Sequence, residues 1–474
     1  MNRYETLASQ IEDEIRRGIL ISGERMPSVR ELSSREKVSP STVVEAYGLL
    51  AERGWIQARP RSGFFVSRQP SPTPPPSSRA RQALVGEGFA LEPSDLVFAL
   101  RQAAHDPKII PFGAAMAGPA FFPYRAIARS ISRVLRDEPA LSSEYVFPPG
   151  SLALRQAIAS RFHRFGVAAR AEDVVTAGGA TEAICLALRA VAQPGDVVLL
   201  ESPTYFGILQ IVNALGYSVL EVPAHPSQGL EPAKFEEALR RMKGRVKAAI
   251  VTPNHSNPLG ARIPDAAKAE LVRIAARERV VLIEDDVYGE LPHDGVRPKP
   301  LKAFDRSEAV ILCSSFSKTI APGLRVGFVM SSRHAKALSL LRSSTGSGVA
   351  IVAEETIAHY LSEGGFDRHL RRVRREYATL VARFSSALRQ ALPEGTRINE
   401  PLGGYVLWLQ LPGGMDSRLL QKRALAEGIS VASGAMFSAQ GAYRDCLRIC
   451  CALPWGRAVE RGIERLGKVV RSCL

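Results

Sequence analysis

The chain has 474 residues, 46% of them hydrophobic, so it is long enough for two or three domains with a large buried core. No apolar run reaches the roughly 18 residues of a membrane-spanning helix, and the six cysteines form no CxxC pair, so a soluble, cytoplasmic protein without a zinc site or disulfide scaffold is expected. The net charge of +15 suggests a nucleic-acid partner, but residues 1–69 carry 11 basic and 9 acidic side chains, so most of the excess lies further along the chain.

Residues 28–37 predict a short helix capped by Ser28, and residues 38–54 predict a second helix after a tight turn. Residues 55–66 predict two short strands around a turn that contains Gly63. Small hydroxyl residues at the start of the second helix could approach phosphates and base edges of double-stranded DNA. The pattern indicates a helix-turn-helix with a β-wing, although a small helical domain that packs on a partner is the alternative.

A stretch rich in proline and serine follows, SRQPSPTPPPSSRARQ at residues 67–82. This composition favours an extended linker over a helix or a sheet. We therefore expect a DNA-binding domain at residues 1–68, a linker at 69–90 and a large domain at 91–474. A smaller α+β subdomain is expected mainly at residues 365–474.

Beyond the linker, short apolar runs alternate with helical patterns, which indicates an α/β fold with βαβ units around a mixed, mostly parallel sheet. The predicted strands are 196–201, 247–252, 280–285, 309–314 and 325–330, and the predicted helices are 181–192, 204–215, 234–243 and 265–279. A long helix from about residue 365 precedes strand-like runs at 403–412 and 446–454.

Lys318 lies in the stretch SSFSKTIAPGLRVG, directly after a predicted strand. The carboxyl end of a parallel strand directs the residues that follow it into the ligand crevice. A lysine there can form a Schiff base with a carbonyl compound if its amine is neutral. If that compound is pyridoxal 5'-phosphate, the site also needs an acid for the ring nitrogen, a cradle for the phosphate and a support for the ring.

The stretch LIEDDVYGE at residues 282–290 can supply the acid. Asp285 and Asp286 both fit by chemistry, and Tyr288 can donate to the ring hydroxyl. Paired acids at a strand end could instead bind Mg²⁺, although we expect no metal here.

A phosphate cradle is predicted where small residues open a helix, in TAGGATEAICLAL at residues 176–188. Tyr205 could stack on the ring, and Asn257, in an Asn-Pro turn, could donate to the ring hydroxyl. A core aromatic and a turn residue are the alternative readings of these two positions. The predicted phosphate ligands are Gly179, Ala180, Thr181, Ser315, Ser317 and Arg325.

In this order along the chain, the motifs resemble the fold-type I aminotransferase family over about residues 110–474. The resemblance implies that Lys318 forms the aldimine with pyridoxal phosphate. It also implies that Asp285, three residues before Tyr288, pairs with the ring nitrogen.

Three further roles rest on the same resemblance. Arg448, in the stretch CLRICCALP, would bind a substrate α-carboxylate through its forked guanidinium. Gly118 would lie in the loop on the substrate side. Tyr145 would reach the phosphate of the partner subunit, which implies a homodimer with shared sites.

The N-terminal stretches RMPSVREL and ARPRSGFFV resemble the GntR-type winged helix-turn-helix. The chain departs from that pattern at Pro40 and Val44, where relatives often carry other residues. Glu45 could read a cytosine, or it could be a solvated or capping residue. The resemblance assigns DNA contacts to Arg30, Ser39, Ser41 and Thr42, and to Arg59, Arg61 and Gly63 in the wing.

Together, the two domains in this order resemble the MocR subfamily of transcriptional regulators. The resemblance implies a regulator that binds DNA and pyridoxal phosphate and senses an amino acid, an amine or the cofactor itself. Two alternatives are a working aminotransferase that carries a DNA-binding domain and a degenerate aminotransferase fold used only for dimerisation.

Overall fold

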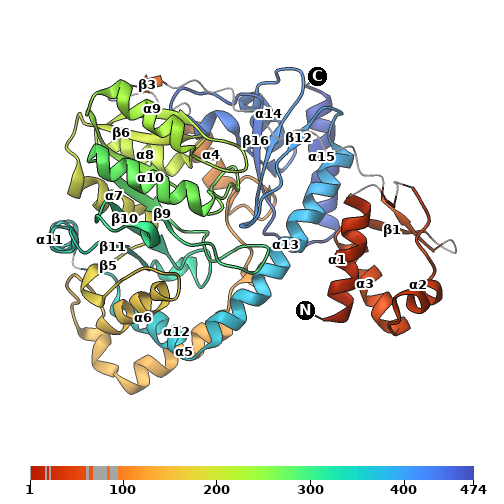
Figure 1. Cartoon of the computed structure of the whole chain (residues 1–474), viewed down its shortest axis with the longest axis horizontal. Helices are drawn as coiled ribbons and strands as arrows, with labels where there is room; N and C mark the ends of the chain where they lie inside the picture. Colours follow the sequence, from red (N-terminus) through yellow and green to blue (C-terminus); the bar gives the residue numbers. More distant parts are fainter. Residues whose placement is uncertain are drawn as a thin grey trace.

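The computed structural model describes residues 2–16, 19–20, 23–59, 63–67, 83–85, 94–346 and 348–473. The N-terminal domain contains the expected helix-turn-helix and wing, and it lies at one side of the large domain, with α1 next to the long helix α13 (Gly365–Ala391) (Figure 1). Its elements are α1 (Arg3–Arg16), α2 (Val29–Glu36), α3 (Pro40–Glu52), β1 (Ile56–Arg59) and β2 (Gly63–Val66).

Short-range signals in the sequence set the starts of α2 and α3. The Ser28 hydroxyl accepts the Glu31 amide and the Glu31 carboxylate accepts the Ser28 amide, which forms a capping box. Ser39 accepts the amide of Thr42 at the start of α3, and Pro40 occupies the first turn. The core beneath these helices includes Leu7, Ile11, Leu32, Val43, Tyr47 and Leu50.

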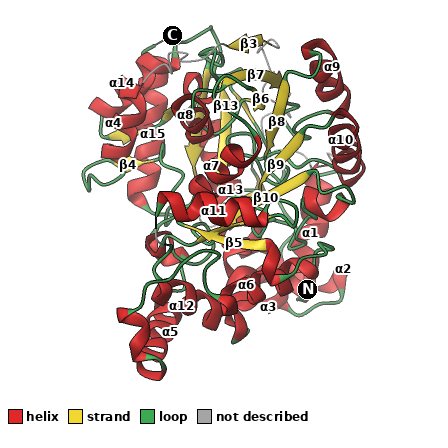
Figure 2. Ribbon diagram, turned by 90° about the vertical axis from the view of Figure 1, so that its left-hand side faces the viewer, coloured by secondary structure: helices red, strands yellow, loops and turns green. Residues whose placement is uncertain are grey.

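A mixed sheet forms the centre of the large domain and confirms the expected α/β fold. Its described strands run in the order β3-β7-β6-β8-β9-β10-β11-β5; the neighbours from β7 to β10 pair in parallel, and β3 and β11 pair antiparallel. Helices α7 and α8 pack on one face, and α9 and α10 pack on the other (Figure 2). The bounds are β3 (Ala83–Val85), β5 (Val174–Ala177), β6 (Val197–Ser202), β7 (Ser218–Pro223), β8 (Val246–Val251), β9 (Val281–Asp285), β10 (Val310–Ser315), β11 (Gly327–Met330), α7 (Ala180–Val191), α8 (Phe206–Ala214), α9 (Pro232–Met242) and α10 (Asp265–Glu278).

Strand β3 lies inside residues 69–90, which the composition predicts to be linker. It pairs antiparallel with β7, with Leu84 opposite Leu220. The outer edge of β7 would otherwise present unpaired backbone groups, and a short strand satisfies them even without a strong strand signal of its own. Residues 69–82 and 86–90 of the expected linker lie outside the described residues.

The small domain is built on an antiparallel sheet with the order β12-β13-β16-β15. It also takes up residues from before the large sheet, because β4 pairs in parallel with β14. The bounds are α4 (Ser94–Ala103), β4 (Ile110–Pro111), β12 (Arg397–Ile398), β13 (Val406–Gln410), α14 (Ser417–Ala426), β14 (Ile429–Ser430), β15 (Ala432–Ser433), β16 (Cys446–Cys450) and α15 (Arg457–Arg471).

A buried ionic cluster joins the large and small domains around Glu290. The Glu290 carboxylate accepts hydrogen bonds from Arg161 Nε at 2.7 Å and from Arg374 Nη2 at 3.2 Å, and Arg297 Nε lies 3.5 Å from it. Arg297 also pairs with Asp286. The cluster therefore ties the loop after β9 to helix α6 (Leu152–His163) and to α13.

Helices α5 (Tyr124–Asp137), α11 (Ala335–Thr345) and α12 (Ile351–Ser362) also belong to the large domain. Across all the ranges described above, no helix is both long and apolar enough to cross a membrane.

Replacing Glu290 with alanine should lower the free energy of unfolding by about 3–5 kcal/mol, because its buried arginines lose their counter-charge. Urea denaturation followed by circular dichroism measures this loss. Glu270→Ala is the matched control, because it removes an exposed partner of Arg273 and should cost less than about 1 kcal/mol. Equal losses in the two variants would contradict a structural role for the cluster.

Candidate functional site

The carboxyl ends of the central strands open onto a pocket of about 300 Å³ between the large and small domains. Gly118 does not line this pocket, and its amide instead donates to the Ala452 carbonyl oxygen at 2.9 Å. Tyr145 also lies outside the pocket and is 81% exposed. The predicted residues that line the pocket are Ala180, Thr181, Tyr205, Asn257, Asp285, Tyr288, Ser315, Ser317, Lys318, Arg325 and Arg448.

Lys318 follows β10 and points into the pocket, where its Nζ donates to the Ala115 carbonyl oxygen at 2.8 Å. Burial lowers the pKa of Lys318 to about 8, and the positive charges of Arg448 and Arg325 act in the same direction, against Cys450 and Asp285. A sizeable fraction of the amine is therefore neutral near neutral pH, as attack on a carbonyl carbon requires.

The structure separates the two acids that follow one another in the sequence. Asp286 is tied to Arg297 and accepts a hydrogen bond from Asn254 Nδ2 at 2.9 Å, so it belongs to the ionic cluster. Asp285 lines the pocket, and its Oδ1 is buried without a hydrogen-bond partner among the described residues. Burial, with the nearby charge of Asp286, raises the pKa of Asp285 to about 7. Asp285 is thus the acid available to a ligand, and Asp286 is not free to bind Mg²⁺.

Two other polar groups at the pocket share this condition. The Tyr288 hydroxyl and Arg448 Nε are buried, and neither has a hydrogen-bond partner within the described part of the chain. Buried polar atoms without partners are costly unless a ligand satisfies them. An acid, a hydroxyl and a guanidinium edge around a lysine match the ring nitrogen, ring hydroxyl and carboxylate that the sequence motifs predict, so these residues fit pyridoxal phosphate with an amino acid.

The predicted phosphate cradle forms where β5 passes into α7. Gly179 caps α7 with a φ of +119°, and a Cβ on it would stand 2.7 Å from Arg325 Nη2, so the close approach requires glycine. Arg325 Nη2 donates to the Gly178 carbonyl oxygen at 2.7 Å, and Arg325 Nη1 lies 3.5 Å from Ser317 Oγ. The α7 amides, beginning with Ala180, and the Arg325 guanidinium together form an anion site.

Arg448 connects the small domain to the pocket. It lies on β16 and is almost fully buried; its Nη1 donates to Asn257 Oδ1 at 3.4 Å, and its Nη2 donates to the Gly113 carbonyl oxygen. Two of its nitrogens are thereby held by the chain, and Nε has no partner among the described residues. The contact also orients the Asn257 amide in the pocket.

Helix α4 also contributes to the pocket, and sequence motifs gave no sign of it. Arg101 and His105 extend from this region to the mouth of the pocket, together with Leu100 and Ala104. An arginine in an ordinary amphipathic helix carries no local signal of a ligand, because only the pairing of β4 with β14 brings this segment to the pocket. Met116 joins the lining in the same way.

The inner side of α13 packs directly behind the pocket. His369 Nε2 lies 2.8 Å from the carbonyl oxygen of Thr319, the residue after Lys318. The Tyr377 ring packs 4.9 Å from the Tyr405 ring, which in turn lies 5.4 Å from the Tyr288 ring. Helix α13 thus contacts both the lysine loop and the tyrosine that lines the pocket.

The outer side of the same helix contacts the N-terminal domain (Figure 1). Arg375 Nη1 lies 3.8 Å from Glu5 Oε1 of α1. Further along α13, Ser386 Oγ is 3.0 Å from the position that a Cβ on Gly54 would occupy. One helix therefore separates the pocket from the predicted DNA-binding domain and touches both.

The predicted DNA-contacting residues of the two helices are gathered at their N-terminal ends. Arg30, Ser39 and Ser41 are exposed, and Ser39 Oγ lies 2.8 Å from both Ser41 Oγ and Thr42 Oγ1. Val44 is also exposed on α3, so an apolar side chain is available for contacts with bases.

In the wing, the structure covers only part of the prediction. Gly63 has a φ of +92° at the turn, which favours glycine. Arg59 is described only as part of the β1 backbone, and Arg61 lies outside the described residues. Arg53, at the end of α3, pairs with Glu12 at 3.2 Å and so ties α3 to α1 instead of extending toward DNA.

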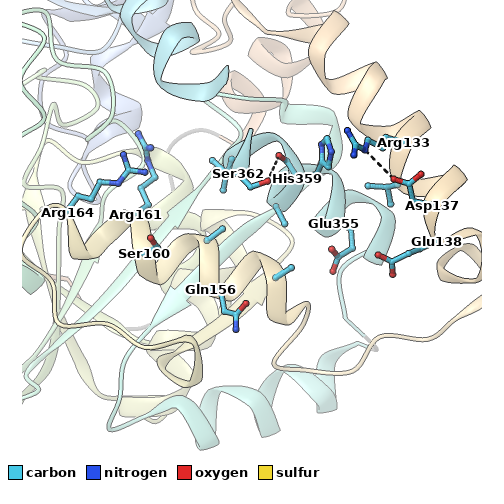
Figure 3. Close-up of a pocket in the computed structure, with 15 residues that line it drawn as sticks. Arg133, Asp137, Glu138, Gln156, Ser160, Arg161, Arg164, Glu355, His359 and Ser362 are labelled. Carbon is cyan, nitrogen blue, oxygen red and sulfur yellow. Dashed lines mark hydrogen bonds and ion pairs between the residues drawn. The ribbon is translucent and has the colours of Figure 1, made fainter. Parts of the chain in front are cut away.

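Figure 3 shows a second pocket, of about 600 Å³, between α5, α6 and α12. Its charged groups already have partners: Arg133 pairs with Asp137 at 3.2 Å, and Arg161 and Arg164 both pair with Asp367 of α13. None of the predicted site residues lines it. The strand-end pocket is therefore the candidate functional site.

Replacing Asp285 with asparagine should stabilise the ligand-free protein, and more so at pH 8 than at pH 4. Below pH about 4 the acid is neutral in both the folded and the unfolded state. Between about 4 and 7 the unfolded chain releases the proton while the folded protein keeps it, so the wild type loses stability that the variant retains. Urea denaturation of both proteins across this range measures the difference, and a difference independent of pH would contradict the assignment.

Comparison with known proteins adds two family matches. Residues 121–466 match "Aminotransferase class I and II", and residues 3–66 match "Bacterial regulatory proteins, gntR family". The uncharacterized HTH-type transcriptional regulator YdcR of Escherichia coli is 36% identical over 474 residues, which cover 100% of both chains. The "Probable rhizopine catabolism regulatory protein MocR" of Rhizobium meliloti is 27% identical over 90% of this chain and 85% of its own.

A solved structure shares the fold of the large domain. It is the α-aminoadipate aminotransferase LysN from Thermus thermophilus, complexed with N-(5'-phosphopyridoxyl)-L-leucine. It is 28% identical, superposes with a TM-score of 0.73, and covers 79% of this chain and 95% of its own.

Proposed function

This chain belongs to the class I and II aminotransferase family and carries an N-terminal gntR-type domain, and from this we propose that it is a transcriptional regulator controlled by pyridoxal phosphate and an amino acid or amine. The observation that carries the proposal is the set of unsatisfied polar atoms on Asp285, Tyr288 and Arg448 around Lys318. A fold kept only for dimerisation has no reason to retain that set, because each atom costs stability.

The pocket residues would divide the cofactor among them. Lys318 would hold its aldehyde carbon, Asp285 its ring nitrogen and Tyr288 with Asn257 its ring hydroxyl, while Tyr205 would cover the ring. The phosphate ligands would be Gly179, Ala180, Thr181, Ser315, Ser317 and Arg325. Bound there, pyridoxal phosphate supplies an electron-accepting ring and a carbonyl carbon that amines can attack.

Arg448 would fix the α-carboxylate of an amino acid through its unsatisfied Nε. Asp285, kept neutral by burial in the free pocket, would give up its proton to the bound ring nitrogen and leave a carboxylate beside a cation. Both groups are fixed before the ligand arrives, so little ordering cost falls on binding.

A homodimer with shared sites is part of the proposal. Tyr145, Phe147 and Leu152 are large apolar side chains that lie within eight positions of one another and are more than half exposed. Such a patch favours contact with another protein surface. In a dimer, Tyr145 would complete the phosphate site of the partner, which explains why it does not line the pocket of its own chain.

DNA binding would fall to the N-terminal domain, with Arg30, Ser39, Ser41 and Thr42 at the helix starts and Arg59, Arg61 and Gly63 in the wing. Ligand binding would change DNA affinity only if it favours one placement of this domain over another. Helix α13 is the element suited to bias that placement, because its two sides contact the lysine loop and the DNA-binding domain.

The first test is binding of the full-length protein to its own upstream DNA, with and without pyridoxal phosphate and across a panel of amino acids and amines. We expect the DNA affinity to change with the cofactor and with one class of amine. Lys318→Ala should abolish both the cofactor absorbance and the response while leaving basal DNA binding intact. DNA affinity that ignores every ligand would refute the regulator.

The contact on α13 yields a second test. Arg375→Glu should remove most of the ligand-dependent change in DNA affinity, because it places two acids opposite each other at the contact with Glu5. Pyridoxal phosphate binding should not change. Arg371→Glu, with the same charge change one turn earlier, should retain the response, and Glu5→Arg should restore it in the Arg375→Glu background. An unchanged response in Arg375→Glu would exclude this route.

A second candidate function is transamination, favoured because Lys318, Asp285 and Arg448 line one pocket. Incubation with amino acids and 2-oxo acids, followed by product analysis, separates the two candidates. Turnover that Lys318→Ala abolishes, with DNA binding indifferent to ligands, would favour the enzyme.

A further inference from the structure

The strand-end pocket holds more positive charge than the proposed function uses. That function, on which this inference rests, accounts for Lys318, Arg325, Asp285 and Arg448. Two further groups, Arg101 and His105, are left without a role, and Asp285 is the single acid among the lining residues. The charged side chains and histidine of the lining are Arg101, His105, Asp285, Lys318, Arg325 and Arg448.

Arg101 stands at the mouth of the pocket with its charge uncompensated. Its Nη2 donates to Gln210 Oε1 of α8 at 3.1 Å, which positions the guanidinium between α4 and α8 through a neutral partner. No carboxylate in the described ranges pairs with it. One turn later, His105 Nδ1 lies 3.2 Å from the Arg101 carbonyl oxygen, so the histidine stays beside it.

Arg101 and Arg448 act on the same part of the pocket. Burial raises the pKa of Tyr205, and the positive charges of Arg448 and Arg101 both oppose that rise. Tyr205 is the predicted cover of the cofactor ring. A ligand bound at this ring therefore lies within reach of two guanidinium fields, one from the small-domain strand β16 and one from α4.

The lining near these arginines is apolar. It suits the hydrocarbon part of a ligand, because methylene groups gain by burial there while a second polar group would need a partner. The apolar lining residues are Leu100, Met116, Ile184, Phe206, Ile208 and Ile211.

We propose that the effector is an amino dicarboxylate, whose α-carboxylate binds Arg448 and whose distal carboxylate binds Arg101 across the apolar lining. A cationic side chain would meet Arg101 and His105 with no acid to receive it, so like-charge repulsion excludes diamino acids. A neutral side chain would cover Arg101 without giving it a partner. Recognition of both ends distinguishes amino dicarboxylates from all other amino acids of the same length.

The test is calorimetric titration of the full-length protein, loaded with pyridoxal phosphate, with matched pairs of amino acids. L-2-Aminoadipate is compared with L-norleucine and L-glutamate with L-norvaline, so that each pair differs in the distal carboxylate, and L-lysine supplies the opposite charge. The dicarboxylate of each pair should bind at least about tenfold more tightly, as a hydrogen bond to a charged group implies. L-Lysine should bind most weakly.

Arg101→Gln should bring the two members of each pair to the same affinity and leave pyridoxal phosphate binding unchanged. Arg306→Gln, which neutralises an exposed arginine outside the pocket, is the control and should discriminate as the wild type does. Equal affinities in the wild type, or discrimination that survives Arg101→Gln, would refute the proposal. Weaker cofactor binding in Arg101→Gln would make Arg101 a phosphate ligand instead. If the loaded protein binds no amino acid at all, the proposed sensing function itself fails.

Discussion

Glu290 holds three arginines that come from distant parts of the chain, and this buried charge cluster fixes the geometry of the molecule. Arg161 lies on α6, Arg297 follows β9 and Arg374 lies on α13. Unpaired charges are very costly in a buried position, so these three elements cannot separate without exposing the cluster. The loop that begins at Asp286 is thereby locked to the helix that supports the DNA-binding domain.

The pocket next to this cluster obeys the opposite rule. Asp286 is fully engaged with Arg297 and Asn254, whereas its neighbour Asp285 keeps one oxygen free of partners. Successive side chains at a strand end point in opposite directions, so adjacent acids can serve the framework and the ligand separately. The free polar atoms lower stability, and the saturated cluster behind them supplies the rigidity that keeps them in position.

Helix α13 gives these two regions a common support. Its inner side contacts Thr319 and Tyr405, and its outer side contacts Glu5. A rigid helix of this length can pass a small displacement from a pocket to a surface because packed interfaces shift between discrete arrangements. The ionic cluster prevents the helix from moving independently of the pocket floor, so occupancy of the pocket and placement of the reader are mechanically linked in the proposed regulator.

The sequence by itself determined the local features of this protein. The caps at Ser28 and Ser39, the alternation of strands and helices, and the ligand-type residues at strand ends follow from signals within a few positions, which the local backbone must obey. Lys318, Asp285 and Tyr288 could be found because each follows an apolar strand, and parallel strands end at one edge.

Only the tertiary structure decided between Asp285 and Asp286, because the choice depends on Arg297 and Asn254, whose positions no local pattern fixes. It also brought Arg101 to the pocket, built β3 from expected linker and placed α13 between the two domains. These contacts join residues far apart in the sequence, and their energies depend on burial that exists only after the chain has folded.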